Sequence, residues 1–406
     1  MLHPIHGFVH PRFEAVRTAF HENFSLHGEL GASVCMYHRG EKVVDLWGGF
    51  ADRKATIAWE ADDLTTIFSV TKGIVATCYL ILVDQGRINY SDPIAQYWPE
   101  LCENTKEIRF REERKQLRIA DLLNHRSGLL GFQEALTLDC LENELELLKR
   151  LESEPLRWKP NTKQGYHGVS FGLYAGALFK KITGQSIGSF LRDDIKSKLA
   201  LDLYMGLTDE ELNQLQPRIR PIFPNQMSDI LSGILPSLLG THREGHFYRA
   251  ALNKNSDTAF AFGQPAELGA RGLKNFNLER VQRLELPWAN CLGSARALAK
   301  FYQSLLKPNY LVRSKTLEQV FARQSWAEKD AVIRKTMGFS YGFVKEESTL
   351  FSPNPEAFGH PGAGGALGFA DPKAELTIGY VMNRMGYQVR SPRALALCHA
   401  AHDCLT

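Results

Sequence analysis

The chain has 406 residues and an ordinary globular composition, with 44% hydrophobic, 23% charged and 10% aromatic residues, which excludes extensive disorder, a fibre or a low-complexity protein. Its 48 Lys and Arg against 45 Asp and Glu leave a formal net charge of +3, so a uniformly basic surface for nucleic acid is excluded as well. The length corresponds to about two or three domains.

Targeting signals are not visible in the sequence. The first residues lack the basic segment and apolar run of a secretory signal. The most apolar stretch, residues 74–83, covers only half of the ~20 residues that a bilayer span requires. Seven scattered cysteines, an odd number, are typical of reduced thiols. We therefore expect a cytoplasmic protein with no membrane span, the alternative being a secreted form that has lost its signal.

The first part of the chain predicts a helix, a hairpin and a second helix. The first helix is expected over 11–24, and strands over 32–38 and 42–47 follow it. Apolar residues then recur at helical spacing over 69–84 and predict a buried helix.

The centre of the chain is dominated by helical patterns, among them 119–124, 140–151, 171–182 and 187–199. Strand character returns at 366–370 and 376–382, and a last helix is predicted over 392–404. Strands at both ends with helices between them predict an α+β fold, with one antiparallel sheet built from both termini and flanked by helices. The expected domains are a sheet domain (1–90 and 280–406) and an inserted, mostly helical domain (91–279).

Ser69 and Lys72 stand one helical turn apart at the start of the helix over 69–84. This spacing puts the lysine amine and the serine hydroxyl on the same face. Serine becomes a strong nucleophile when a neighbouring base removes its proton, and a lysine desolvated by apolar neighbours has a pKa low enough to serve as that base. Amides at the helix N-terminus favour a developing oxyanion. The alternative is a surface helix start that Ser69 caps.

Three blocks of sequence, in order, carry a resemblance to a known family. They are residues 68–94, which begin Phe-Ser-Val-Thr-Lys, residues 119–129, which contain Leu-Leu-Asn-His-Arg-Ser-Gly-Leu, and residues 358–372, which begin Phe-Gly-His-Pro-Gly. Together they resemble the serine β-lactamase and penicillin-binding superfamily, in the branch that holds class C enzymes and family VIII carboxylesterases. The resemblance implies a β-lactamase/transpeptidase-like fold with the active site between its two domains.

The resemblance also implies a second base. In these families a tyrosine follows a Pro-Gly or Pro-Asn turn, and Tyr166 matches it after Pro160-Asn161. A phenol between positive or polar groups can have its pKa lowered toward neutrality and can shuttle the serine proton. The alternative for Tyr166 is a packed aromatic residue whose hydroxyl finds a hydrogen-bond partner.

The remaining site residues are implied by position in the matched blocks. The amides of Ser69 and Ala363 would form the oxyanion hole, and His360, Gly362 and His167 would contact the substrate. No metal ligand is implied.

Two departures from the lactamase pattern favour an esterase. The tyrosine motif of lactamases usually ends in asparagine, which helps to hold the substrate amide, whereas this chain has Gly168. The Lys-Thr/Ser-Gly triad is replaced by His360-Pro361-Gly362, so groups that would bind an antibiotic carboxylate are missing.

Other motifs receive structural interpretations. Ser186 lies in a Gly-x-Ser-x-Gly motif, but the residues before it predict a helix rather than the required strand, so Ser186 is expected to cap the next helix. Cys398 and His402 share a helical face, and residues 242–246 carry two histidines, but neither spacing matches a zinc site. The apolar stretch 227–239 is expected to pack in the core, with an acyl-pocket wall or an interface as alternatives.

The sequence thus predicts a carboxylesterase-type serine hydrolase that forms an acyl-enzyme on Ser69 and needs no cofactor. The expected partner is a small-molecule ester with a lipophilic acyl group, no nucleic acid is expected, and a homo-oligomer stays open. A β-lactamase, a D-amino-acid peptidase and an acyltransferase would use the same nucleophile and remain alternatives, with weak β-lactamase activity as a side reaction. A non-catalytic binding or scaffold protein is the alternative from another class.

Overall fold

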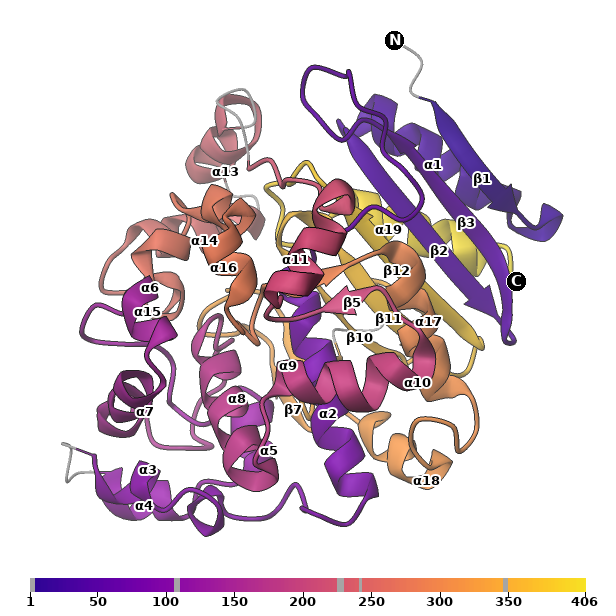
Figure 1. Ribbon diagram of the computed structural model, residues 1–406. Coiled ribbons are helices and arrows are strands. Elements are labelled where there is room, and N and C mark those ends of the chain that lie inside the picture. The colour runs from indigo at the N-terminus through magenta and orange to yellow at the C-terminus, as the bar shows by residue number, and fades with distance from the viewer. Residues whose placement is uncertain (1–3, 106–109, 225–229, 241–242, 346–349) are drawn as a thin grey trace.

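The protein is described here by a computed structural model that covers residues 4–105, 110–224, 230–240, 243–345 and 350–406 (Figure 1). Its central feature is a nine-stranded antiparallel sheet with the order β1-β3-β2-β12-β11-β10-β9-β8-β7. The strands are β1 (Ile5–Val9), β2 (Gly31–His38), β3 (Glu41–Gly49), β7 (Ser325–Ala327), β8 (Met337–Ser340), β9 (Phe343–Val344), β10 (Phe358–Pro361), β11 (Leu367–Asp371) and β12 (Leu376–Met382). The prediction of an α+β fold with one sheet from both termini is confirmed.

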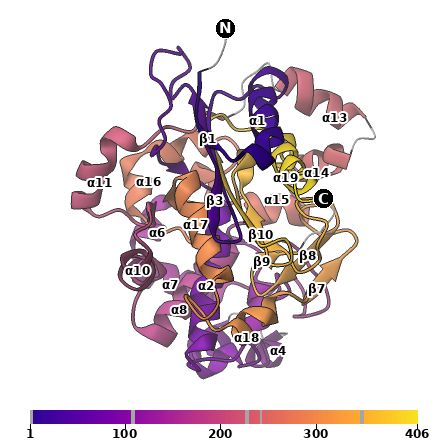
Figure 2. The ribbon, with the colours of Figure 1, turned by 90° about the vertical axis from the view of Figure 1, so that its right-hand side faces the viewer.

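The two ends of the chain meet in the middle of this sheet. Strands β2 and β12 run antiparallel with Cys35 opposite Gly379, and every residue of β12 is buried. Helix α17 (Ala295–Leu306) packs on one face so closely that a Cβ at Gly379 would lie 2.2 Å from the Ala295 carbonyl oxygen. Helices α1 (Glu14–Leu26) and α19 (Pro392–Asp403) pack together on the opposite face (Figure 2). Burial from both sides explains why β12 is a continuous apolar run rather than an alternating one.

Helix α2 (Val70–Asp84) joins the sheet to the helical part of the molecule. All of its residues from Val70 to Leu82 are buried, as expected for a helix that is apolar on every side. It contacts β10 and β11 of the sheet and α8 (Ser170–Thr183) of the helical part. The N-terminus of α2 therefore lies where the two parts of the molecule meet.

The centre of the chain forms mostly short helices. They are α3 (Glu100–Glu103), α4 (Arg111–Lys115), α5 (Ile119–Leu123), α6 (Leu138–Glu142), α7 (Glu144–Ser153), α8, α9 (Ile187–Phe190), α10 (Ser197–Leu199), α11 (Asp209–Leu215), α13 (Leu235–Leu239), α14 (Arg243–Leu252), α15 (Asp257–Phe262) and α16 (Glu279–Arg283). The single helix predicted over 140–151 is divided at Asn143, whose side chain accepts a hydrogen bond from the Glu146 amide and so begins α7. A three-stranded sheet, β4 (Thr65–Thr66), β6 (Leu292–Gly293) and β5 (Leu203–Tyr204), leads into α2.

Several features of the fold were not predicted from the sequence. Strand β1 lies at the sheet edge and is largely exposed, and β8 and β9 are only four and two residues long, so none of them has a usable hydrophobic period. Helix α18 (Ser314–Leu317) is similarly short. All seven cysteines are free thiols. Among the described residues, no helix combines the length and the apolar character needed to cross a bilayer.

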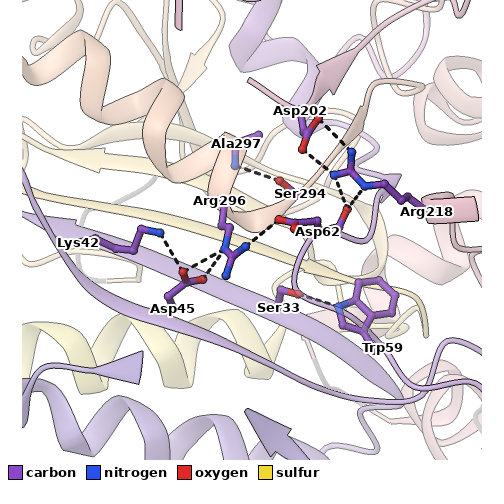
Figure 3. A network of polar contacts seen from close by, with 10 residues as sticks. All are labelled: Ser33, Lys42, Asp45, Trp59, Asp62, Asp202, Arg218, Ser294, Arg296 and Ala297. Atoms are coloured by element: carbon purple, nitrogen blue, oxygen red, sulfur yellow. Dashed lines mark hydrogen bonds and ion pairs between the residues drawn. The ribbon is translucent and has the colours of Figure 1, made fainter. Parts of the chain in front are cut away.

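A network of ion pairs joins the sheet to the loops beside it (Figure 3). Arg296 of α17 lies 2.9 Å from Asp45 of β3 and 2.7 Å from the Asp62 carboxylate. Arg218 binds the Asp62 carbonyl and lies 2.6 Å from Asp202. The network connects strand β3, helix α17 and the segment that precedes α2.

Candidate active site

Ser69 is presented at the start of α2 by a sharp turn of the backbone. The preceding residue, Phe68, has a left-handed backbone with φ +45°, which is rare for a bulky residue and marks a strained site. Ser69 itself is partly exposed and its side chain makes no capping hydrogen bond. The alternative interpretation, a serine that merely caps its helix, is therefore wrong.

Lys72 lies beneath Ser69 as a fully buried side chain. Its Nζ is 3.2 Å from Ser69 Oγ and donates to the Trp288 carbonyl oxygen at 2.9 Å. None of the described carboxylates forms an ion pair with it. Burial alone holds the pKa of the Lys72 amine well below its usual value, because a charged amine without a counter-ion is costly in an apolar interior. A neutral amine next to a hydroxyl can accept its proton.

Tyr166 completes this group of three. The Lys72 Nζ lies 5.0 Å from the centre of its ring. Burial raises the pKa of the Tyr166 phenol, the nearby Asp330 carboxylate raises it further, and hydrogen bonding by Ser69 only partly opposes them. The expected lowering of this pKa is not found, because burial outweighs the hydrogen bond of Ser69. Burial thus favours the uncharged forms of both the Lys72 amine and the Tyr166 phenol.

Asp330 holds the Tyr166 segment in place. Its Oδ1 accepts hydrogen bonds from the amides of Tyr166 at 3.0 Å, Val332 at 2.9 Å and Ile333 at 2.9 Å. The carboxylate is fully buried, and burial raises its pKa although these amide bonds oppose the shift. Sequence reasoning missed this residue, since nothing in the order of residues brings position 330 to position 166.

The histidines near Lys72 are buried and neutral. His167 Nδ1 lies 2.6 Å from the Gly165 carbonyl oxygen and Nε2 lies 2.9 Å from Ser127 Oγ, so both ring nitrogens are used inside the protein. Its amide donates to His125 Nδ1 at 3.0 Å. Burial lowers the pKa of His167 to about 4. His167, expected to touch the substrate, instead binds the Tyr166 segment to the block over 119–129.

His360 is also withdrawn from the surface. The side chain is 2% exposed, and its Nδ1 lies 2.7 Å from the Pro361 carbonyl oxygen. Burial, together with Lys72, lowers the pKa of His360 to about 3, so this position carries no positive charge at neutral pH. His360 lines the back of the group, with its ring 6.0 Å from that of Tyr166, rather than an open binding surface.

Gly362 and Ala363 approach the N-terminus of α2. A Cβ at Gly362 would lie 2.4 Å from the Ile67 carbonyl oxygen, so only glycine allows this approach. Neither the Ser69 amide nor the Ala363 amide donates a hydrogen bond to any described residue, and Ala363 is exposed. Free N–H groups are the elements from which an oxyanion hole is made, and Gly362, the neighbour of Ala363, contacts Ile67 and Val70 on either side of Ser69.

The other motifs take no part in this group. Ser186 caps α9 by accepting from the Ser189 amide, and it donates to Glu285 at 2.6 Å. This confirms its interpretation as a cap. Cys398 is a buried thiol, His402 lies 3.7 Å from Asp371, and the described residues contain no cluster of three metal-ligating side chains. Residues 225–229 and 241–242 lie outside the described residues, so the interpretations of 227–239 and 242–246 are tested only in part. Within the first stretch Leu231, Leu235 and Leu239 are exposed, so the expected packing in the core is wrong for these residues.

This arrangement of fold and residues defines a β-lactamase-type serine hydrolase, and comparison with known proteins agrees. The β-lactamase family model matches residues 20–401, so the chain belongs to that family, an enzyme superfamily that includes esterases. It is 27% identical to the esterase/β-lactamase LipL of Mycobacterium tuberculosis, over 94% of this chain and 83% of the relative.

Solved structures extend the comparison. A family VIII carboxylesterase superposes with a TM-score of 0.82 and 33% identity, over 99% of this chain and 100% of the other. A penicillin-binding protein homologue from Caulobacter crescentus gives a TM-score of 0.82 and 30% identity, with the same coverage. The recognition made from the three sequence blocks is thereby confirmed.

Proposed function

We propose that the protein is a carboxylesterase that cleaves carboxylic esters through an acyl-enzyme on Ser69. The observation that carries this proposal is the contact of the partly exposed Ser69 hydroxyl with the fully buried Lys72 amine, which forms no ion pair with a carboxylate in the part of the chain that the structure describes. A base that stays neutral near pH 7 is what serine needs to become a nucleophile.

The reaction follows from the resting protonation states. Ser69 Oγ attacks the ester carbonyl while its proton passes to Lys72 Nζ, and the Ser69 and Ala363 amides donate to the oxyanion that forms. As the tetrahedral intermediate collapses, the leaving alcohol takes a proton from the Tyr166 hydroxyl. The Lys72 ammonium then gives a proton to Tyr166, which restores the phenol. Water then attacks the acyl-enzyme and gives its proton to the same pair. The bond between Ser69 Oγ and the acyl carbon then breaks, and Ser69 Oγ takes that proton back from the pair. The acid leaves, and Ser69, Lys72 and Tyr166 are in their starting states.

Esters are favoured over β-lactams and peptides by the charge of the site. The position of the family's lysine is held by His360, a neutral ring with a pKa of about 3, so no cation is offered there to a substrate carboxylate. The family's asparagine is Gly168, so the side-chain amide is absent too. β-Lactam hydrolysis is then a weak side reaction. The seven free thiols favour a reducing compartment, the cytoplasm.

Active-site labelling tests the nucleophile. A fluorophosphonate probe followed by peptide mapping should label Ser69, and Ser69→Ala should lower nitrophenyl-ester turnover by about 10³-fold or more. Ser186→Ala is the matched control and should keep full activity. Loss of activity in Ser186→Ala with retention in Ser69→Ala would contradict the proposal, and the absence of any label would favour a non-catalytic scaffold.

A direct comparison of substrates tests the reaction class. Turnover of a short-chain nitrophenyl ester should exceed that of a chromogenic cephalosporin. The opposite ranking would make the protein a β-lactamase.

A further inference from the structure

An aromatic ring occupies the space beside Gly168, two residues after Tyr166. A Cβ at Gly168 would lie 2.4 Å, 2.7 Å and 2.9 Å from Cε1, Cδ1 and Cζ of Phe262. These distances are far shorter than any ordinary contact, so no larger residue fits while the ring stays. The φ of Gly168 is not positive, and the backbone there would accept other residues. Glycine at 168 is therefore explained by Phe262 and not by a turn.

Phe262 stands at the end of α15 and faces the Tyr166 ring, with 6.2 Å between the two centres. A second ring, Phe247 of α14, packs edge-on against it at 6.1 Å and 81°. We call Phe262 and Phe247 the aromatic wall. Both rings are only partly buried, so part of their apolar surface is accessible to solvent.

The surroundings of the aromatic wall are apolar. Tyr166 shares a hydrophobic cluster with buried side chains of the neighbouring loops, and the aromatic wall packs against that cluster. The cluster members are Leu130, Trp158, Tyr166, Ala261, Val332, Ile333, Met337, Phe339 and Val344. Apolar surface of this kind gains free energy by covering hydrocarbon, roughly 0.8 kcal/mol for each buried methylene. The rings of Phe262 and Phe247 themselves carry no polar atom that could pair with an amide.

We propose that the aromatic wall is the subsite for the acyl chain of the substrate, and that the Gly168–Phe262 contact selects for apolar acyl groups and against acyl groups bearing an amide. This inference rests on the proposed ester hydrolysis at Ser69. The substrate class is an ester whose acyl part carries several carbons and no polar group near the carbonyl. An amide placed against Phe262 would lose its water without gaining a hydrogen bond, which is unfavourable.

The test compares Phe262→Ala with Phe260→Ala. Phe260 belongs to the same helix and packs against the same cluster, but its ring lies 5.0 Å from the Arg157 guanidinium carbon and is not one of the two rings of the aromatic wall. Hydrolysis of nitrophenyl acetate and hexanoate is measured for both variants and the wild type. Phe262→Ala should lower kcat/KM for the hexanoate by about tenfold or more and change the acetate value by less than about threefold, since four fewer methylenes reach the wall. Phe260→Ala should keep the wild-type ratio.

A second series varies the alcohol and keeps the acetyl group. Phenyl and naphthyl acetates should respond alike to Phe262→Ala, because the wall contacts the acyl part. An effect confined to this second series would overturn the acyl assignment. An unchanged hexanoate-to-acetate ratio in an active Phe262→Ala enzyme would overturn the subsite while leaving ester hydrolysis at Ser69 intact. A wild-type protein that cleaves no ester of any length would overturn the proposed function, and the subsite with it.

Thermal unfolding tests the contact independently of activity. Gly168→Ala should lower the Tm of the wild-type protein, because the added Cβ meets the Phe262 ring. The same substitution should lower the Tm much less in the Phe262→Ala background. Equal losses in both backgrounds would show that the two residues do not share the space and would overturn the Gly168–Phe262 selection. If Phe262→Ala does not fold, Phe262→Leu shortens the wall while keeping it apolar, and the same ester ratio applies.

Discussion

Arg296 and Lys72 are both basic side chains at the boundary between the sheet and its surroundings, but they are held in opposite ways. Arg296 is about one-third exposed and lies between two carboxylates, those of Asp45 and Asp62 (Figure 3). Burial opposes its charge, yet these carboxylates raise its pKa. Lys72 is fully buried, contacts the Ser69 hydroxyl and the Trp288 carbonyl, and forms no ion pair with any described carboxylate, so burial lowers its pKa.

The same contrast holds for the acidic partners. In the ion-pair network, burial would raise the pKa of Asp202, but the hydrogen bond and charge of Arg218 lower it. In the candidate active site the buried Asp330 meets amides instead of a cation, and its pKa is raised. The network keeps its charges because each has a partner. In the candidate active site, Lys72 and Asp330 have no oppositely charged partner among the described residues, and burial shifts both pKa values toward the neutral forms.

The largest expected effect comes from forcing a charge onto position 72. Arginine cannot lose its proton in proteins, so Lys72→Arg should lower kcat/KM for an ester by about 10³-fold and also destabilise the fold. The matched control is Lys345→Met. That lysine is largely buried as well, burial lowers its pKa to about 8, and it donates to the Pro355 and Ala357 carbonyls away from Ser69. Lys345→Met should lower the free energy of unfolding and leave kcat unchanged. A Lys72→Arg enzyme with normal turnover would show that position 72 does not need a neutral amine, and would contradict the difference drawn between Lys72 and Arg296.

The next effect concerns the segment that carries Tyr166. Asp330→Ala leaves three buried amides without an acceptor and should cost about 3 kcal/mol of unfolding free energy, with a fall in kcat larger than any change in KM. Asp330→Asn keeps one acceptor oxygen and should cost about 1 kcal/mol. Urea unfolding and ester kinetics measure both quantities. Unchanged kcat in a folded Asp330→Ala protein would mean that Asp330 does not position Tyr166.

The neutral histidines predict a loss of stability in acid. His167 and His360 have pKa values of about 4 and about 3 in the folded protein and about 6.5 when unfolded. Between these values the unfolded chain binds more protons, so stability is full above pH 6.5 and falls as the pH drops toward 4, by on the order of 1 kcal/mol per histidine and pH unit. Urea unfolding at pH 7, 5 and 4 measures this. His360→Asn should flatten the decline and the exposed His21→Gln should not, whereas equal slopes would show that His360 is not held neutral.

The smallest effect is expected in the ion-pair network. Arg296→Met removes two partly exposed ion pairs and should cost about 1 kcal/mol or less, with the cost shrinking in high salt and kcat unchanged. Salt-dependent thermal unfolding measures it. A large loss of unfolding free energy that does not depend on salt would mean that the charges of Arg296, Asp45 and Asp62 behave as buried ones. The ion-pair network and the candidate active site would then not differ in how they hold charge.

The sequence was most informative where the chemistry is local. The Ser69–Lys72 spacing fixes both side chains on one helical turn, and the structure brings them within 3.2 Å. The sheet could be predicted from the apolar runs of β2, β3, β11 and β12, which are long enough to show a pattern. Tyr166 could be found through the family resemblance, but its raised pKa depends on burial by distant segments.

Contacts between remote parts of the chain could not be predicted. Asp330 reaches Tyr166 across 164 positions, and Phe262 meets Gly168 from a different helix. The burial and hydrogen-bond partners of His167 and His360 could not be predicted for the same reason, because they are set by the folded neighbours. Periodicity reports which face of an element is buried, whereas these roles depend on what the element is buried against.

In the proposed mechanism a neutral Lys72 activates Ser69, and the rate of fluorophosphonate labelling reports that activation. Measured from pH 5 to pH 10 with peptide mapping, the wild-type protein should be labelled on Ser69, at a rate that rises with pH and levels off well below the usual lysine pKa of about 10.4. Lys72→Met should lose about 10³-fold of that rate. Labelling at another serine, or an equal rate in Lys72→Met, would contradict the account.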